Sequence, residues 1–112
     1  MKYATLIYSK PGSHEGLSED ESKTVFGDYR ALSEDPRCLS GGQLQPVETA
    51  TTVRVQNGNT LTTDGPYADT KEVFGGYYVF EASDLDEAIQ LASRIPAARL
   101  GGAIEVRPVV EQ

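Results

Sequence analysis

The residues best suited to chemistry lie in one polar loop of this 112-residue chain, at positions 64–72, whose sequence is Asp-Gly-Pro-Tyr-Ala-Asp-Thr-Lys-Glu. Asp64 could serve as a general base or polar anchor, which makes it the first candidate catalytic residue. Tyr67 could form a lid or stacking surface, and Lys71 could hold an anionic ligand, with Asp69 as a further ligand-binding residue. Together these side chains predict a small-molecule site in a cleft near the loop.

A structural interpretation of the same loop stays open. Asp-Gly-Pro is turn chemistry, because Asp bonds its own backbone, Gly supplies a positive φ and Pro fixes the next dihedral angle. The charged side chains that follow could be solvated, with Lys71 in an exposed ion pair worth about 0–1 kcal/mol. Under this interpretation the motif is a folding device rather than a site.

His14 is the only histidine of the chain and lies in a polar Ser-His-Glu segment. Because an unperturbed imidazole titrates near neutrality, His14 is the second candidate catalytic residue, as a proton carrier; a solvated surface histidine is the alternative. Tyr8 and Tyr78, in predicted strands close to the cleft, are candidate ligand-binding residues. The other tyrosines outside the loop are interpreted as core or dimer-face residues: Tyr3, Tyr29 and Tyr77.

Composition excludes several other classes of function. The 10 basic and 17 acidic residues give a net charge of −7, with no basic run, so nucleic acid is not an expected partner. No apolar run approaches the roughly 20 residues of a membrane-spanning helix, which predicts no membrane association and a cytoplasmic location. One histidine and one cysteine, Cys38, leave no metal-ligand spacing, and no glycine-rich phosphate motif is present. We therefore expect no metal and no cofactor.

Helix signals occur twice. Ser18 and Glu21 form a predicted capping box, and the apolar stripe that follows ends at Asp35-Pro36. Asp84 and Glu87 form a second predicted capping box. The predicted apolar face of this second helix is Leu85, Ala88, Ile89, Ala92 and Ile95, and Pro96 is predicted to end it.

Strand patterns surround both helices. Residues 2–8 and 75–82 are rich in aromatic residues, residues 103–107 alternate, and residues 38–46 suggest a strand with a bulge. Alternating residues on either side of Asn57-Gly58 predict a β-hairpin at 52–63. The order is β-α-β, a hairpin, then β-α-β, in a single domain over residues 1–112. We therefore predict an α+β, ferredoxin-like βαββαβ sandwich with an inserted hairpin and both helices on one face of the sheet. Its bare face predicts a homodimer with the sheets packed face to face.

The 64–72 loop followed by Gly75-Gly76-Tyr77-Tyr78 resembles the signature of the DGPF branch of the YCII-related family. That branch usually reads DGPF-A-E-T-K-E before GGYY, so Tyr67 stands for the phenylalanine and Asp69 for the glutamate. The resemblance covers essentially the whole chain. It implies a bacterial, dimeric α/β-barrel, related to small oxygenase and lactone-isomerase domains. Some relatives use a histidine at the first helix with an aspartate, whereas His14 lies in the loop before that helix.

Three functions are open at this stage. The chain could bind a small molecule near the Asp-Gly-Pro-Tyr loop, with or without acting as a cofactor-free isomerase or lyase. It could be a non-catalytic regulatory or interaction module linked to an extracytoplasmic-function sigma factor, beside which many family members are encoded. It could also be a structural dimer in which the motif only directs folding.

Overall fold

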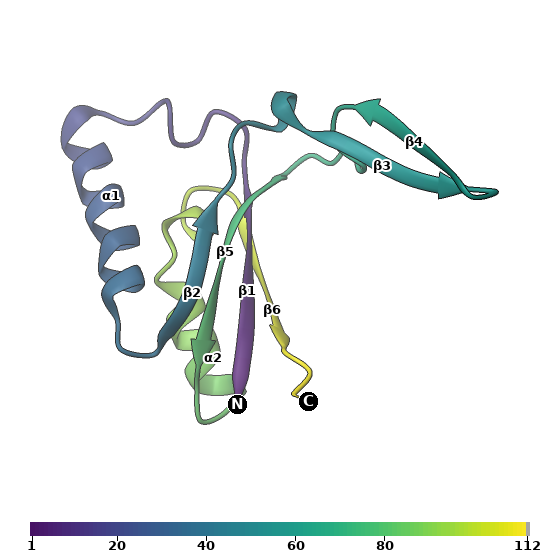
Figure 1. Ribbon diagram of the computed structural model, residues 1–112. Coiled ribbons are helices and arrows are strands. Elements are labelled where there is room, and N and C mark those ends of the chain that lie inside the picture. Colours follow the sequence, from purple (N-terminus) through teal and green to yellow (C-terminus); the bar gives the residue numbers. More distant parts are fainter. Residues whose placement is uncertain (112) are drawn as a thin grey trace.

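The chain forms one four-stranded antiparallel sheet, two helices and a separate two-stranded hairpin (Figure 1). The computed structural model describes residues 1–111. In chain order the elements are β1 (Lys2–Ser9), α1 (Glu19–Glu34), β2 (Cys38–Gln43), the 3₁₀ turn η1 (Val47–Thr49), β3 (Thr51–Gln56), β4 (Asn59–Asp64), β5 (Val73–Glu81), α2 (Leu85–Ser93), the 3₁₀ turn η2 (Pro96–Ala98) and β6 (Ala103–Pro108). The strand order β2-β5-β1-β6 confirms the predicted ferredoxin-like α+β fold.

Helix α1 begins and ends as predicted. The Ser18 hydroxyl accepts a hydrogen bond from the Glu21 amide at 3.1 Å, and the Glu21 carboxylate accepts one from the Ser18 amide at 3.2 Å. This reciprocal pair satisfies two amides that the first turn would otherwise leave without partners. The helix ends at Asp35, whose extended backbone conformation suits the residue before Pro36.

Helix α2 corrects two predictions. Asp84 caps it by accepting from the Glu87 amide at 2.9 Å, but the Glu87 carboxylate accepts from the amide of Ser83, not of Asp84, so no capping box forms. Leu85 and Ile89, predicted on the apolar face, are about half exposed. The residues that are buried instead lie on the side of the helix that meets the sheet, and they keep the spacing of a helical stripe. They are Ala88, Leu91, Ala92 and Ile95.

The core lies between the helices and one face of the sheet. Phe80 of β5, Leu32 of α1 and Leu91 of α2 are fully buried there. Thr5 of β1 is the buried polar residue of this layer, and its hydroxyl donates to the Tyr78 carbonyl at 2.9 Å. Since that bond satisfies the hydroxyl, burying it carries little penalty.

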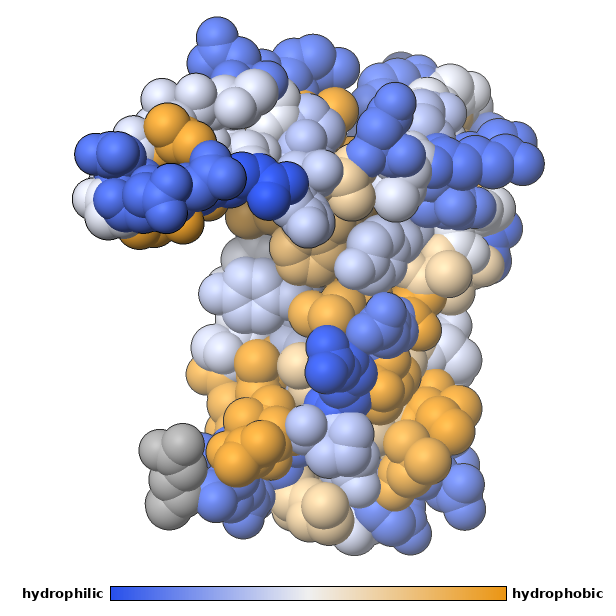
Figure 2. Space-filling model, turned by 90° about the vertical axis from the view of Figure 1, so that its right-hand side faces the viewer, coloured by the Kyte–Doolittle hydropathy of each residue, from blue (hydrophilic) through white to orange (hydrophobic). Residues whose placement is uncertain are grey.

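The opposite face of the sheet has no helix over it (Figure 1). Successive side chains of a strand point to opposite faces, so the register places Leu6, Tyr77 and Val79 on this open face. Leu6 and Val79 are only half-buried, and Tyr77 is exposed. Figure 2 views the molecule from this side and shows apolar side chains gathered over its lower half.

Residues 51–64 form a projecting hairpin, here called the arm. Its strands β3 and β4 pair only with each other, and the Asn57-Gly58 turn has the positive φ values, 52° and 78°, that two-residue hairpin turns require. The arm extends away from the body on the side of the open face (Figure 1). It raises the radius of gyration to 15.8 Å, whereas a compact chain of this length has about 13 Å.

No helix within residues 1–111 combines the length and apolar character needed to cross a membrane.

Asp35 joins the end of α1 to the start of β2. Its carboxylate accepts bonds from the Arg37 backbone amide at 2.8 Å and from two guanidinium nitrogens of Arg37 at 2.9 and 2.8 Å, and Arg94 lies 3.8 Å away. These bonds from Arg37, with the charges of both arginines, lower the pKa of Asp35 to about 2. The side chain is only 11% exposed, so solvent screens the cluster incompletely.

This cluster predicts acid sensitivity. Because the folded-state pKa of Asp35 lies below its unfolded value, its contribution is present above about pH 4 and is lost as the pH falls toward 2. We expect Asp35→Asn to cost about 1 kcal/mol of unfolding free energy at pH 7 and to flatten the acid limb of a urea-denaturation series. Glu111→Gln, at an exposed position, is the control. An Asp35→Asn protein with the wild-type acid limb would contradict the assignment.

Candidate functional site

The predicted ligand loop follows the arm directly. Asp64 is the last residue of β4, and its side chain and those of Asp69 and Lys71 are exposed. Within residues 1–111, none of these three charged side chains makes a hydrogen bond or an ion pair. Tyr67 is 75% exposed, and the Arg54 guanidinium lies 5.0 Å from the centre of its ring. Such a cation–π contact holds the loop along β3.

The backbone of the loop is fastened to the base of the arm. Gly65 has a φ of 104°, in the region that favours glycine. Its amide donates to the Ala50 carbonyl at 2.8 Å, and its own carbonyl accepts from the Thr52 hydroxyl at 2.8 Å. The predicted positive φ of the glycine is therefore confirmed, whereas the Asp64 side chain makes no hydrogen bond to its own backbone within the described residues. The solvent-facing side chains next to it keep their ligand role as a prediction.

Tyr8 and Tyr78 lie on opposite faces of the sheet, so one chain cannot bring both to a single pocket as the sequence had suggested. Tyr8 is on the open face, where its ring lies 5.4 Å from that of Phe74. Tyr78 is on the helix side, against α1. The separation follows from register: Thr5 pairs with Tyr78 and shares its face, and Tyr8, three residues further along the regularly alternating β1, points to the opposite face.

His14 and Tyr78 both meet Tyr29, a residue that sequence reasoning had assigned to the core or dimer face. The His14 Nε2 atom lies 2.9 Å from the Tyr29 hydroxyl, and Nδ1 lies 3.0 Å from the Ser13 hydroxyl. The imidazole also stacks on the Tyr29 ring, with centroids 5.9 Å apart and 27° between planes. Both ring nitrogens are thus engaged, which fixes the imidazole in place without fixing its tautomer.

The loop before α1 folds so that His14 reaches back to the helix. Gly12 has a φ of 79° and its carbonyl accepts from the Gly16 amide at 3.1 Å, while Ser13 donates to the Lys10 carbonyl at 3.0 Å. These bonds close a turn of the kind that glycine permits. The turn places His14 beside Tyr29 of the following helix, so the histidine is half-buried rather than solvated.

Tyr78 fastens the sheet to α1. Its hydroxyl donates to the Tyr29 carbonyl at 2.9 Å, and burial raises its pKa to about 12, so the phenol stays protonated. The ring fits because Gly41 of β2 has no side chain: a Cβ there would lie 2.8 Å from Tyr78 Cδ1 and 2.9 Å from the Tyr77 carbonyl oxygen. Burial also raises the pKa of the Tyr29 phenol, opposed in part by the charge of Arg99.

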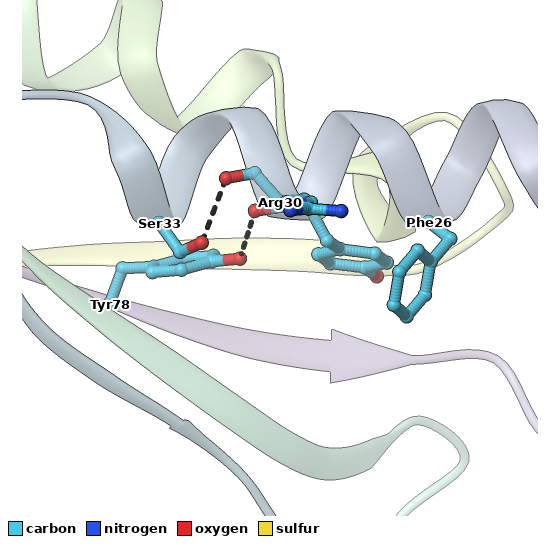
Figure 3. Close-up of a pocket in the computed structure, with 5 residues that line it drawn as sticks. Phe26, Arg30, Ser33 and Tyr78 are labelled. Atoms are coloured by element: carbon cyan, nitrogen blue, oxygen red, sulfur yellow. Dashed lines mark hydrogen bonds between the residues drawn. The ribbon is translucent and has the colours of Figure 1, made fainter.

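A groove of about 230 Å³ lies between α1 and β5 next to this junction (Figure 3). Its walls are Phe26, Tyr29, Arg30 and Ser33 of α1 and Tyr78 of β5. Phe26 is 71% exposed, so a large apolar ring faces solvent at one end. The Arg30 guanidinium is held by Glu34 at 3.0 Å, and the Ser33 hydroxyl donates to the Arg30 carbonyl at 2.8 Å. We call this the α1 groove.

The α1 groove has the size and lining of a site for one ring. An enclosed apolar cavity of about 150 Å³ can hold a benzene molecule. The α1 groove, about 230 Å³, is a depression open to solvent, so it can cover a ring only in part. Aromatic walls favour stacking, and the guanidinium and hydroxyl supply polar contacts at the rim. A second groove of about 170 Å³, on another side of α1, is crossed by an Arg99–Asp28 ion pair at 2.7 Å. Within residues 1–111 no cluster of three or more metal-ligating side chains occurs.

Four groove residues that sequence reasoning did not select share one signal. Phe26, Tyr29, Arg30 and Ser33 stand at i, i+3, i+4 and i+7, which places them on one side of a helix. This stripe runs beside the core stripe and mixes aromatic with polar residues. Tyr29, interpreted from the sequence as a core or dimer-face residue, is only half-buried, and Phe26 is exposed.

Comparison with known proteins places the chain in a family. The model of the YCII-related domain matches residues 1–112, the whole chain. The chain belongs to the YCII-related domain family. A relative, the uncharacterized protein R00369 of Rhizobium meliloti (strain 1021), is 34% identical over 116 residues, covering 97% of this chain and 92% of the relative. The predicted family resemblance is thereby confirmed.

One solved structure has a similar fold. It is the 5-chloro-2-hydroxyhydroquinone dehydrochlorinase (TftG) from Burkholderia phenoliruptrix AC1100, in a complex with 2,5-dihydroxybenzoquinone. The alignment has a TM-score of 0.56, covers 100% of this chain and 96% of that one, and contains 18% identical residues. At that identity the comparison supports the shared fold of the YCII-related domain and nothing finer.

The fit of Tyr78 against Gly41 yields a stability prediction. Gly41→Ala is expected to cost about 1–3 kcal/mol of unfolding free energy, because the new methyl group must displace a buried ring or the β2–β5 backbone. Gly27→Ala is the matched control: nothing lies within 4 Å of its Cβ position in α1, so the gain in helix propensity should stabilise by about 0.5–1 kcal/mol. Chemical denaturation of both variants measures the difference. Equal effects would contradict the close fit of Tyr78.

Proposed function

We propose that this YCII-related protein binds a small single-ring molecule in the α1 groove and moves a proton on it without a cofactor, as isomerases and lyases do. The observation that carries the proposal is the hydrogen bond of 2.9 Å between His14 Nε2 and the Tyr29 hydroxyl, where Tyr29 also lines the groove. A proton-transfer pair is thus joined directly to a ring-sized space.

The pair can relay a proton in a balanced step. In one tautomer, the Tyr29 hydroxyl donates to His14 Nε2 while Nδ1–H donates to the Ser13 hydroxyl. As Tyr29 passes its proton to His14, its oxygen takes a proton from a carbon next to a substrate carbonyl, leaving an enolate and an imidazolium. The imidazolium then returns the proton through Tyr29 to a different carbon, which completes an isomerisation. Alternatively the enolate expels an anionic leaving group, and the imidazolium gives its proton to that anion or to water, which completes an elimination.

The surroundings suit such a substrate. Burial raises the pKa of Tyr29, so its phenol is protonated at neutral pH and its proton moves only together with the transfer to His14. Arg30, at the groove wall, carries guanidinium donors that could contact the developing enolate, with its charge shared by the Glu34 carboxylate. The structural neighbour, a dehydrochlorinase, binds 2,5-dihydroxybenzoquinone, a single ring with enolic oxygens. That ligand is therefore a reasonable first probe for this chain.

The loop at 64–72 is the second candidate ligand site, favoured by one observation. Arg54 lies over Tyr67, and Lys71 is exposed nearby in sequence, so the loop offers positive charge and an aromatic surface to an anionic ligand. Asp64 would act there as a polar anchor or general base and Asp69 as a further polar contact, with Tyr8 contributing from the open face. An Asp64→Ala variant that binds the probe normally would exclude Asp64 from the primary site.

We also propose that the protein is a homodimer in which the open faces of two sheets meet. Leu6, Val79 and Tyr77 form an apolar surface that the helices leave uncovered. The charged groups of this face balance: Lys2 stands opposite Glu81, and Arg107 lies 3.8 Å from Glu105. Two such faces can therefore approach although each chain carries a net charge of −7.

The single histidine gives a direct test of ligand binding. In an untagged protein the imidazole Cε1 and Cδ2 proton signals belong to His14 alone, so ¹H NMR titration with 2,5-dihydroxybenzoquinone reports on the α1 groove. We expect saturable shifts of both signals in the wild type. Phe26→Ala is expected to weaken binding by about 1–3 kcal/mol, because it removes a stacking wall. Ile89→Ala, on exposed helix surface outside the groove, is the control.

Proton transfer has a separate readout. Exchange of ring C–H for deuterium in D₂O, followed by ¹H NMR of the probe, is expected to be enzyme-dependent and to fall about 10²–10⁴-fold in His14→Gln, because the relay loses its terminal base. Tyr29→Phe should cause a comparable loss while the probe still binds. Binding without enzyme-dependent exchange would reject the enzymatic part and favour a binding or regulatory module.

The homodimer makes a prediction about the open face. Light scattering of the wild type is expected to give twice the chain mass of 12.1 kDa. Val79→Glu should dissociate it, because a carboxylate at the centre of the face would lose its hydration without a partner. Gln90→Glu, on the exposed side of α2, should remain dimeric. A 12.1 kDa wild type at micromolar concentration would contradict the homodimer.

A further inference from the structure

The arm has little to hold it in an isolated chain. Its two strands hydrogen-bond only to each other, and a two-stranded hairpin alone in water is marginally stable. Apart from Thr52, every residue of β3 and β4 is exposed. The hydrogen bonds at its base close the hairpin on its own flanking residues, from the Gly65 amide to the Ala50 carbonyl and from the Thr52 hydroxyl to the Gly65 carbonyl. The remainder extends outward as a strand pair with solvent on both faces (Figure 1).

The arm nevertheless exposes aliphatic side chains to solvent. Val53 and Val55 are 60% and 70% exposed, and alternation puts them on the same face. Their cross-strand partners, Thr62 and Thr60, are β-branched as well. Leu61 is exposed on the other face, opposite Arg54. Exposed β-branched and aliphatic residues on a thin hairpin indicate a surface that is covered in the working protein.

We propose that the arm is a clasp for a second copy of this chain, packing Val53 and Val55 against the partner's body. This inference rests on the proposed homodimer and adds to it, since the sheets alone could form the dimer without the arm. It assigns the arm to the interface and leaves the α1 groove free on the outer, helix-covered side of each subunit.

A second copy is the occupant that the geometry favours. The arm projects on the same side as the open face, so the two surfaces form a concave corner rather than two separate patches (Figures 1 and 2). In a two-fold symmetric dimer both subunits make the same contacts, so each arm would reach over the body of the other subunit.

The net charge of the arm also favours a second copy of the chain over an unrelated, strongly charged partner. The arm carries Arg54 and Asp64 as its charged residues, so its net charge is zero although the whole chain is at −7. A surface for nucleic acid or another strongly charged partner would carry an excess of the opposite charge. A hairpin with no net charge and with exposed valines instead matches the charge-balanced, partly apolar open face of an identical chain.

The test measures the affinity of the dimer and the protection of the arm amides from hydrogen exchange. Val53→Thr/Val55→Thr keeps the branched side chains and the β propensity of the arm while removing apolar surface, and Val53→Lys/Val55→Lys places charge in the interface. Ser22→Lys/Gln90→Lys adds the same charge at exposed helix positions. Sedimentation equilibrium gives the dimer dissociation constant, and hydrogen–deuterium exchange read by NMR follows the backbone amides of β3 and β4 at low and high protein concentration.

The clasp predicts that arm amides are protected more strongly as the dimer forms, because an isolated hairpin opens readily. The threonine variant is expected to raise the dissociation constant at least about tenfold, the lysine variant more, and the helix control by less than about twofold. If the wild type dimerises while its arm amides exchange equally at both concentrations and the arm variants dimerise like the control, the clasp is wrong and the sheet-to-sheet dimer stands. If the wild type is a monomer, both are wrong.

Discussion

A sheet covered on one side only is the constraint on which the rest of this structure depends. Both connections that carry helices cross the same face, so the strands must be apolar on that side to form the core with Leu32, Leu91 and Phe80. The other side is apolar without a cover. This division gives the two faces different tasks. The helix side of the sheet can build a closed junction and a groove, whereas the open side is suited to contact with another surface.

The helix side owes its groove to a tight junction. Gly41 leaves room for the Tyr78 ring, and the Tyr78 hydroxyl holds the backbone of α1 at Tyr29. The turn at Gly12 then brings His14 onto the same tyrosine. Each step depends on the one before, because a displaced Tyr78 would move α1 relative to the sheet and alter the spacing between the proton-transfer pair and the groove. Rigid elements, rather than the exposed loop at 64–72, thus position the proposed chemistry.

Local patterns in the sequence predicted most of the fold, because local chemistry determines those features. The Ser18 capping box, the stop at Asp35-Pro36 and the Asn57-Gly58 turn each involve residues within a few positions of one another. The errors arose where tertiary packing decides. The buried stripe of α2 is set by the direction in which the helix crosses the sheet, and the opposite orientations of Tyr8 and Tyr78 depend on the register in which β1 pairs with β5. The site was harder to predict, since the partnership of His14 and Tyr29 depends on a loop turning back onto a helix.

We propose that the open face of the sheet is covered in solution by a second copy of the chain. Solvent paramagnetic relaxation of methyl groups tests it most directly, with a soluble gadolinium chelate as the probe. Leu32, fully buried, and Val110, 81% exposed, give the two limits within the same spectrum. If a second copy covers this face, the methyl groups of Leu6 and Val79 will relax at a rate close to that of Leu32. A rate close to that of Val110 would show that the face is open to water and would contradict the claim.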